Sequence, residues 1–334
     1  MIVVESYTIA VIMCFITMLC WGSWANTQKL ATKKWPFQLF YWDYAIGVVL
    51  LSLVLGITMG SMGSAGRSFF ADLGQATLNS LGLAFLGGII FNLSNILLVA
   101  AIDIAGMAVA FPIGVGLALA LGVITNYMAS PVGNPMVLFI GVALVVAAIL
   151  IDAVAYRRLM SEGQKTTNKG FVLSIAAGIL MGFFYRFVAA SMSADYIVLE
   201  AGKMSPYSAV FVFSLGLLAS NFIWNTYVMY KPIAGERVTY RDYFARGDLG
   251  LHSIGILGGV IWNVGMSFSI IAAGAAGFAI SYGLGQGATM VAALWGVFIW
   301  KEFKGAPEGT NRLLTFMFIC FAIGLTMIIA ARVT

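Results

Sequence analysis

The feature that most constrains this chain is a series of ten apolar stretches, each about 20 residues long, the length that an α-helix needs to cross a bilayer. The composition agrees, because 61% of the residues are hydrophobic and 9% are charged, whereas about a quarter of the residues of a soluble domain are charged. We therefore expect an all-α polytopic membrane protein embedded in a lipid bilayer. The expected helices lie near 6–28, 37–60, 78–101, 105–128, 135–156, 170–192, 205–230, 251–273, 275–299 and 311–332.

Lysine and arginine are distributed unevenly between the two sides of these stretches. Odd-numbered connections hold fourteen of them: Lys29, Lys33, Lys34, Arg157, Arg158, Lys165, Lys169, Lys231, Arg237, Arg241, Arg246, Lys301, Lys304 and Arg312. The even side holds Arg67, Lys203 and Arg332. The positive-inside rule then predicts a cell-membrane protein with a cytoplasmic central connection and both termini outside. This orientation accounts for the net charge of +5, so nucleic acid is not expected as a partner.

An internal repeat organises the chain. Residues 85–116 align without a gap onto 256–287, and eleven of the thirty-two positions are identical, including Gly-Gly followed by Asn in both copies. We expect two five-helix repeats, 1–156 and 170–334, joined by a cytoplasmic loop over 157–169. Because five is odd, the second repeat must enter the membrane from the opposite side, and such a 5+5 inverted repeat is typical of secondary transporters.

Several kinds of chemistry are not indicated by the sequence. Cys14, Cys20 and Cys320 lie inside apolar runs without paired spacing, which predicts neither a disulfide nor a metal site. We find no phosphate-binding loop, zinc-binding helix or nucleophile elbow. We therefore expect no catalytic residue, no metal and no cofactor, and an enzyme is not predicted.

Polar side chains within the apolar runs are the candidate site, because they are costly in hydrocarbon and tend to face a wet interior. The segment 20–30, CWGSWANTQKL, combines tryptophans with amides. Aromatic rings provide flat apolar surfaces, and amides offer both donors and acceptors to a neutral polar solute. We expect substrate contacts from Trp21, Trp24, Asn26, Asn92, Arg186, Asn263, Tyr282 and Gln286.

These residues also have structural alternatives. Tryptophan is enriched at the membrane interface, which is the alternative for Trp24. Asn92 and Asn263 lie on the Gly-Gly helices, where an amide can instead bond between closely packed helices. Arg186, within a span, can extend its guanidinium to the headgroups.

Asp43 lies about two turns into the second expected helix and is the candidate for proton coupling. A carboxylate at that depth would be desolvated, so it could load and release a proton during a transport cycle. The alternative is a structural ion pair with Lys33 or Lys34.

At these residues the chain resembles the ureide permease family of the drug/metabolite transporter superfamily. The likeness is carried by VES at 4–6, Gly-Ser-Trp at 22–24, YWDY at 41–44, NLS at 92–94, SPYSAVFVFS at 205–214 and LWGVFIWKEF at 294–303. Bacterial glucose/ribose uptake porters and the rhamnose–proton symporter are more distantly similar. The resemblance implies ten helices around a cytoplasmic central loop and proton-coupled uptake of ureides or nucleobases, such as allantoin or uracil.

The sequence therefore predicts a secondary transporter that imports a small neutral polar solute by alternating access, coupled to protons. A monosaccharide such as ribose or glucose is the first alternative substrate. A drug or metabolite exporter is the second alternative function. The sequence does not fix the oligomeric state, and a homo-oligomer is compatible with it.

Overall fold

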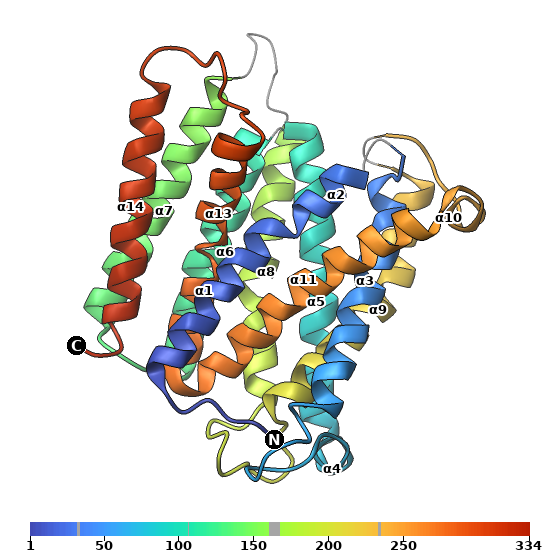
Figure 1. Cartoon of the computed structure of the whole chain (residues 1–334), viewed down its shortest axis with the longest axis vertical. Helices are drawn as coiled ribbons and strands as arrows, with labels where there is room; N and C mark the ends of the chain where they lie inside the picture. Colours follow the sequence, from blue (N-terminus) through green and yellow to red (C-terminus); the bar gives the residue numbers. More distant parts are fainter. Residues whose placement is uncertain (32–33, 106, 160–167, 233–234) are drawn as a thin grey trace.

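The structure, a computed structural model, describes residues 1–31, 34–105, 107–159, 168–232 and 235–334, and these residues form a helical bundle (Figure 1). Lys33, Lys165 and most of the expected 157–169 loop lie outside the described residues. Within the described part, ten segments are long and apolar enough to cross a membrane, from Tyr7–Ala31 to Thr310–Ala330. The prediction of an all-α polytopic membrane protein is confirmed.

The helices follow the expected positions, with two short additions between spans. Their bounds are α1 Tyr7–Ser23, α2 Ala25–Ala31, α3 Phe37–Ile57, α4 Phe69–Gln75, α5 Leu78–Ala105, α6 Met107–Ala129, α7 Pro135–Arg157, α8 Asn168–Ser191, α9 Pro206–Tyr230, α10 Tyr240–Arg246, α11 Leu249–Ala276, α12 Phe278–Gly285, α13 Ala288–Leu294, a π-helical turn Trp295–Ile299, and α14 Thr310–Ala330. The short helices α4 and α10 were not predicted, because seven residues are too few to give an apolar run.

Several helix starts follow directly from local sequence. Asn134 precedes Pro135, and its side-chain oxygen accepts hydrogen bonds from the first-turn N–H groups of α7. Asp248 caps α11 by accepting from the Leu251 N–H at 2.8 Å. Such caps satisfy donors that a helix cannot satisfy itself. They therefore fix where these spans begin.

Two spans that were expected to be continuous helices are interrupted. The first divides at Trp24 into α1 and α2, and there the Thr27 hydroxyl donates to the Trp24 carbonyl at 2.6 Å. The ninth divides at 286–287 into α12 and α13, and the Thr289 hydroxyl donates to the Gln286 carbonyl at 3.0 Å. Side chains thus bond to carbonyls where regular helix stops. Irregular backbone at membrane depth is tolerated where it lines a cavity.

The two ends of the bundle are different. Figure 1 shows both chain termini and α4 at one end, while α2, α10 and the start of α14 lie at the other. We call these the terminal end and the connection end.

Two helix pairs pack through matching asparagines. On α5, the Asn92 amide donates to the Leu217 carbonyl of α9 at 3.2 Å and to the Ser220 hydroxyl at 2.9 Å. On α11, the Asn263 amide donates to the Val48 carbonyl of α3 at 2.8 Å. The two asparagines, 171 residues apart in the sequence alignment, therefore make the same kind of interhelical bond.

Glycines set the close approach of the same helix pairs. A Cβ at Gly88 would overlap with the carbonyl oxygen of Phe213, and a Cβ at Gly259 would overlap with that of Tyr44. Only a residue without a side chain allows backbones to come this close. The α5–α9 and α3–α11 contacts are thus alike, which agrees with two related halves. The inverted relation between the halves remains a prediction.

We predict that Gly88→Ala destabilises the folded protein by about 1–3 kcal/mol, because the new methyl group meets backbone rather than a movable side chain. The measurement is the thermal midpoint of the purified protein in detergent, followed by size-exclusion chromatography. The matched control is Gly82→Ala on the same helix, where a Cβ has nothing within 4 Å. Equal midpoints for both variants would contradict the packing argument.

Candidate functional site

A cavity of about 470 Å³ lies within the bundle and is the candidate site. It is lined by α1, α2, α5, α6, α7, α8, α11 and α13, and so by helices from both predicted halves. Both interrupted spans contribute to its wall. The volume falls in the range of pockets that hold small molecules, about 300–1,000 Å³.

The deep part of the cavity is aromatic. Trp21 and Trp262 lie nearly parallel, with ring centroids 6.0 Å apart and planes inclined by 16°. Phe91 packs on Trp262 with a centroid distance of 4.5 Å, and Phe184 also lines the wall. These rings offer flat apolar surfaces against which a planar or ring-shaped solute can lie.

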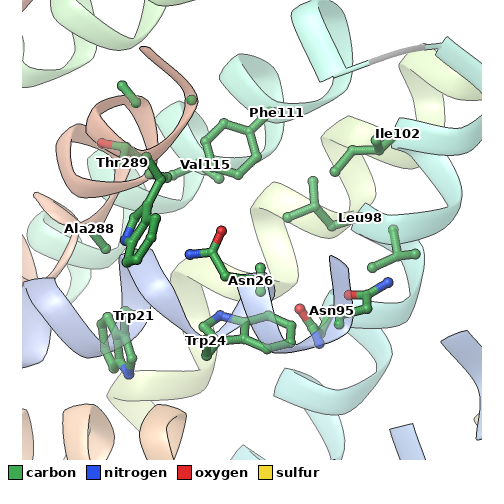
Figure 2. A pocket seen from close by; sticks show the side chains of 18 of the residues that line it. Trp21, Trp24, Asn26, Asn95, Leu98, Ile102, Phe111, Val115, Ala288 and Thr289 are labelled. Carbon is green, nitrogen blue, oxygen red and sulfur yellow. The ribbon is translucent and has the colours of Figure 1, made fainter. Parts of the chain in front are cut away.

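Amide side chains also line the cavity. Figure 2 shows Trp21, Trp24 and Asn26 from the first span across from Asn95 and Leu98 of α5. The Asn95 amide donates to the Tyr41 hydroxyl at 3.0 Å, and the Asn26 amide donates to the Ser23 carbonyl at 3.0 Å. Both amide groups are therefore held in place by protein contacts.

The rim of the cavity at the connection end carries a charged group of residues. The Lys29 ammonium lies 2.7 Å from the Glu302 carboxylate, and the Tyr156 hydroxyl donates to the same carboxylate at 2.7 Å. Burial acts to raise the pKa of the Glu302 carboxyl. The hydrogen bonds from Lys29 and Tyr156, together with the positive charge of Lys29, outweigh burial and hold the pKa below its usual value. Glu302 is therefore ionised at neutral pH.

The predicted site residues divide between this cavity and other places. The cavity is lined by four of them: Trp21, Trp24, Asn26 and Gln286. The other four lie outside its lining: Asn92, Arg186, Asn263 and Tyr282. Asn92 and Asn263 make the interhelical bonds described above. The Tyr282 hydroxyl donates to the Ala118 and Met181 carbonyls at 3.3 and 3.2 Å.

Asp43 lies in a separate buried cluster rather than in the cavity lining. Its side chain is 1% exposed and accepts from the Trp35 indole at 3.1 Å, from the Tyr243 hydroxyl and from His252 Nδ1 at 2.9 Å. Its described partners therefore do not include Lys34, the alternative considered from sequence, and Lys33 lies outside the described residues.

The cluster joins α10 to the membrane-spanning helices. Burial and the Asp43 carboxylate hold the pKa of the Tyr243 phenol well above its usual range, so Tyr243 keeps its proton and donates it to the hydrogen bond. His252 stands at the start of α11 and also contacts Trp35 edge-on, with ring centroids 5.2 Å apart. One buried carboxylate thus connects α3, α10 and α11.

Some cavity residues were absent from the sequence-based set. Asp152, Tyr156 and Glu302 line the rim, although in sequence they lie at helix ends, where solvated carboxylates and interfacial tyrosines are common. Trp295 lines the wall from the π-helical turn after α13. Only the convergence of three distant segments identifies them, so no local signal could have found them.

Beyond the aromatic floor, the half of the bundle toward the terminal end is packed with buried side chains. The Tyr185 and Ser269 hydroxyls lie 3.0 Å apart, and Ser269 in turn contacts the Ser281 hydroxyl at 3.1 Å. The Cys14 sulfur lies 3.6 Å from the Ser281 oxygen. These groups come from α1, α8, α11 and α12, which are therefore in contact with one another on that side.

Known proteins match this chain over most of its length. The profile of the ureide permease family matches residues 40–169 and 155–331. Ureide permease 1 of Arabidopsis thaliana is 22% identical over 388 aligned positions, which cover 99% of each chain. The glucose uptake protein GlcU of Bacillus subtilis (strain 168) is 25% identical, with 84% of this chain and 87% of that protein covered.

A solved crystal structure supports the fold alone. It matches 98% of this chain and 99% of its own, with a TM-score of 0.59 at 14% sequence identity.

The geometry predicts that the cavity is open to water while the terminal half is closed. In a chain whose three native cysteines are replaced by alanine, cysteines introduced at the cavity positions Val99 and Ala292 should react readily with a water-soluble maleimide. A cysteine at Ala118, which is fully buried on α6, should react far more slowly. Similar labelling rates at all three positions, measured by mass spectrometry in detergent, would contradict the described cavity.

Proposed function

The chain belongs to the ureide permease family, whose members are transporters rather than enzymes, and on that premise we propose that it imports a ureide or nucleobase such as allantoin or uracil by proton-coupled alternating access. The multi-pass membrane location follows from the family and from ten apolar spans. The substrate, the coupling ion and the direction of transport are parts of the proposal.

The cavity is the observation that carries this proposal. It combines stacked tryptophans with fixed amides, and its volume of about 470 Å³ suits a single small ring compound with its hydration. Flat heterocycles with several polar edges match such a wall, because rings stack on the indoles while the edges bond to amides. Trp21, Trp24, Asn26 and Gln286 are the proposed solute contacts that line it, with Trp262 added from the structure.

The four predicted contacts outside the lining have a different place in this proposal. Arg186 and Tyr282 lie on α8 and α12, which with α1 and α11 close the terminal half. A solute leaving the cavity toward that end would pass between these helices. Asn92 and Asn263 support the wall by holding α5 and α11 against their partners. We propose that all four act in the outward-facing state or as supports.

The asymmetry of the bundle supports the transport cycle that we propose. The cavity reaches the connection end, where Lys29 and Glu302 form its rim, and the terminal half is packed. If the positive-inside rule holds for this chain, the connection end faces the cytoplasm, and the described conformation is the inward-facing one. An outward-facing state would then open between α1, α8, α11 and α12.

Proton coupling is proposed to act through Asp43. Its carboxylate contacts His252 on α11, and Trp262 on the same helix stacks in the cavity. Ten residues of helix separate them, about 15 Å at 1.5 Å per residue. Loading a proton onto Asp43 would weaken its hold on Tyr243 and His252, and so bias the position of α11 beside the solute. The gradient would thereby act on the cavity without a proton entering it.

A sugar is the alternative substrate, favoured by the likeness to the glucose uptake protein. Tryptophan faces and amides also bind pyranose rings, because sugars present one apolar face and many hydroxyls. The two candidates therefore share a cavity type, and only a direct comparison of solutes separates them.

The proposal predicts that proteoliposomes accumulate labelled allantoin or uracil above the equilibrium level. They should do so only when a proton gradient is imposed in the direction of solute transport. Ribose and glucose, tested in parallel, should not accumulate. Accumulation of a sugar in place of the ureides would support the alternative. Equilibration without concentration would retain a transporter and contradict proton coupling, and absence of flux for all four solutes would contradict the proposed substrates.

Asp43→Asn should abolish gradient-driven accumulation and leave solute exchange between two labelled pools intact, because exchange needs the cavity but no net proton movement. The measurement is both assays on the same reconstituted preparation, and retained exchange also shows that the variant is folded. The control is Glu308→Gln, the same loss of charge at an exposed position. Unchanged accumulation in Asp43→Asn would remove Asp43 from the coupling mechanism.

A further inference from the structure

We propose that the surface between α9 and α11, which carries α10, binds the headgroup of an anionic phospholipid. This segment begins at Lys231, directly after α9, and ends at Asp248, directly before α11. Figure 1 shows α10 at the edge of the connection end of the bundle. Neither the cavity nor the proposed solute takes part, so the site is independent of the proposed function.

Basic side chains gather on this segment. Four of them are exposed: Lys231, Arg237, Arg241 and Arg246. The Arg246 guanidinium lies 2.8 Å from the Glu236 carboxylate and is therefore paired within the protein. The other three have no carboxylate within 4 Å in the part of the chain that the structure describes. The surface thus carries positive charge that the protein itself leaves unpaired.

The two aspartates of the segment are occupied as helix caps. Asp242 accepts from the N–H and from the hydroxyl of Thr239, each at 2.7 Å. Asp248 accepts from the Leu251 N–H at 2.8 Å. Carboxylates at these positions satisfy helix-end donors and are stabilised by the helix dipole. The three unpaired basic side chains are therefore left for an anion from outside the protein.

Two of these cations lie over tyrosines at the end of α9. The Lys231 ammonium is 5.8 Å from the centre of the Tyr227 ring, and the Arg237 guanidinium is 5.0 Å from that of Tyr230. Both rings belong to the last turn of the span, and their residues are 60% and 38% exposed. Exposed tyrosines at the end of an apolar span are typical of the headgroup level of a bilayer. The two cations therefore lie at the level of lipid phosphates.

Apolar surface lies next to this charge. Arg241 and Phe244 are three residues apart on α10 and are therefore neighbours on the helix surface. Phe244 is 79% exposed, and Leu249, at the start of α11, is 85% exposed. Such side chains are favoured at the boundary between headgroups and acyl chains. The surface thus combines a charged part for a phosphate with an apolar part for the beginning of an acyl chain.

The opposite flank of α10 is already bonded to the bundle. The Tyr240 hydroxyl forms a hydrogen bond with the Thr226 hydroxyl of α9. The Tyr243 hydroxyl donates to the Asp43 carboxylate of α3. These contacts hold α10 against two spans through its tyrosines. The flank that carries Arg241 remains exposed and available to lipid.

The chemistry of the surface selects one class of lipid. Arginine binds phosphate oxygens through two parallel N–H groups. A zwitterionic headgroup brings its own ammonium, whereas phosphatidylglycerol brings a net negative charge. Each lysine or arginine near a charged bilayer surface favours anionic lipid by about 5-fold. Free phosphate has nothing to place against Phe244 and Leu249, so we assign the site to a lipid.

The test measures which lipid lies beside α10. A bimane fluorophore is attached to a cysteine at the exposed position Ala245, in a chain whose three native cysteines are replaced by alanine. The protein is reconstituted in phosphatidylcholine vesicles that contain equal small fractions of nitroxide-labelled phosphatidylglycerol or nitroxide-labelled phosphatidylcholine. We expect the labelled phosphatidylglycerol to quench as if enriched about 5–25-fold beside the probe, the effect of one or two basic contacts.

Substitutions assign this preference to the basic residues. Arg241→Gln should lower the enrichment about 5-fold, and Arg237→Gln combined with Arg241→Gln should abolish it. Quenching by labelled phosphatidylcholine should stay unchanged in both variants, which shows that α10 keeps its place. The matched control is Arg312→Gln, the same loss of charge at an exposed position of α14, across the connection end from α10 (Figure 1).

Three results would overturn the proposal. Equal quenching by the two labelled lipids in the unaltered protein would show that the surface does not select anionic lipid. Full enrichment in both arginine variants, or an equal loss in Arg312→Gln, would show that these arginines do not form the site. Absence of quenching by either lipid would show that α10 lies away from the bilayer.

Discussion

The lack of water in hydrocarbon is the constraint on which the rest of this structure depends. Backbone groups in the bilayer must find partners within the protein, so the chain crosses as helices. Regular helix is interrupted within two spans, after Ser23 and around Gln286, and both interruptions lie beside the cavity. Side-chain hydroxyls bond to the carbonyls there. The cavity and the irregular backbone thus occur together for one physical reason.

The sequence predicted the spans well because each depends on a local property, apolar length. Four of the residues that it selected, Trp21, Trp24, Asn26 and Gln286, line the cavity, since polar groups within apolar runs face inward. Their contact with a solute stays a prediction. The rim was not predictable, because Asp152 and Glu302 lie at helix ends where carboxylates are ordinary. Their meeting with Lys29 depends on tertiary packing between segments that are far apart in sequence.

Carboxylates in this bundle occupy two contrasting environments. Asp43 is surrounded by three donors, from Trp35, Tyr243 and His252, and it joins helices. Asp152 lines the cavity, and its buried Oδ1 atom has no hydrogen-bond partner among the described residues. Burial alone would treat the two residues alike. The partners around each carboxylate are what distinguish the two environments.

The glycine contacts of α5 with α9 and of α11 with α3 have a mechanical meaning. Where backbone touches backbone at Gly88 and Gly259, there are no side-chain rotamers to readjust, so neither seam can slide by small increments. We therefore expect α5 with α9, and α11 with α3, each to move as one rigid unit. Boundaries that side chains fill, such as the stacked Trp21 and Trp262 between α1 and α11, do have rotamers that can readjust. The contacts that resist sliding are thus built from glycine, the smallest residue. The contact between α1 and α11 that can readjust is built from tryptophan, the largest.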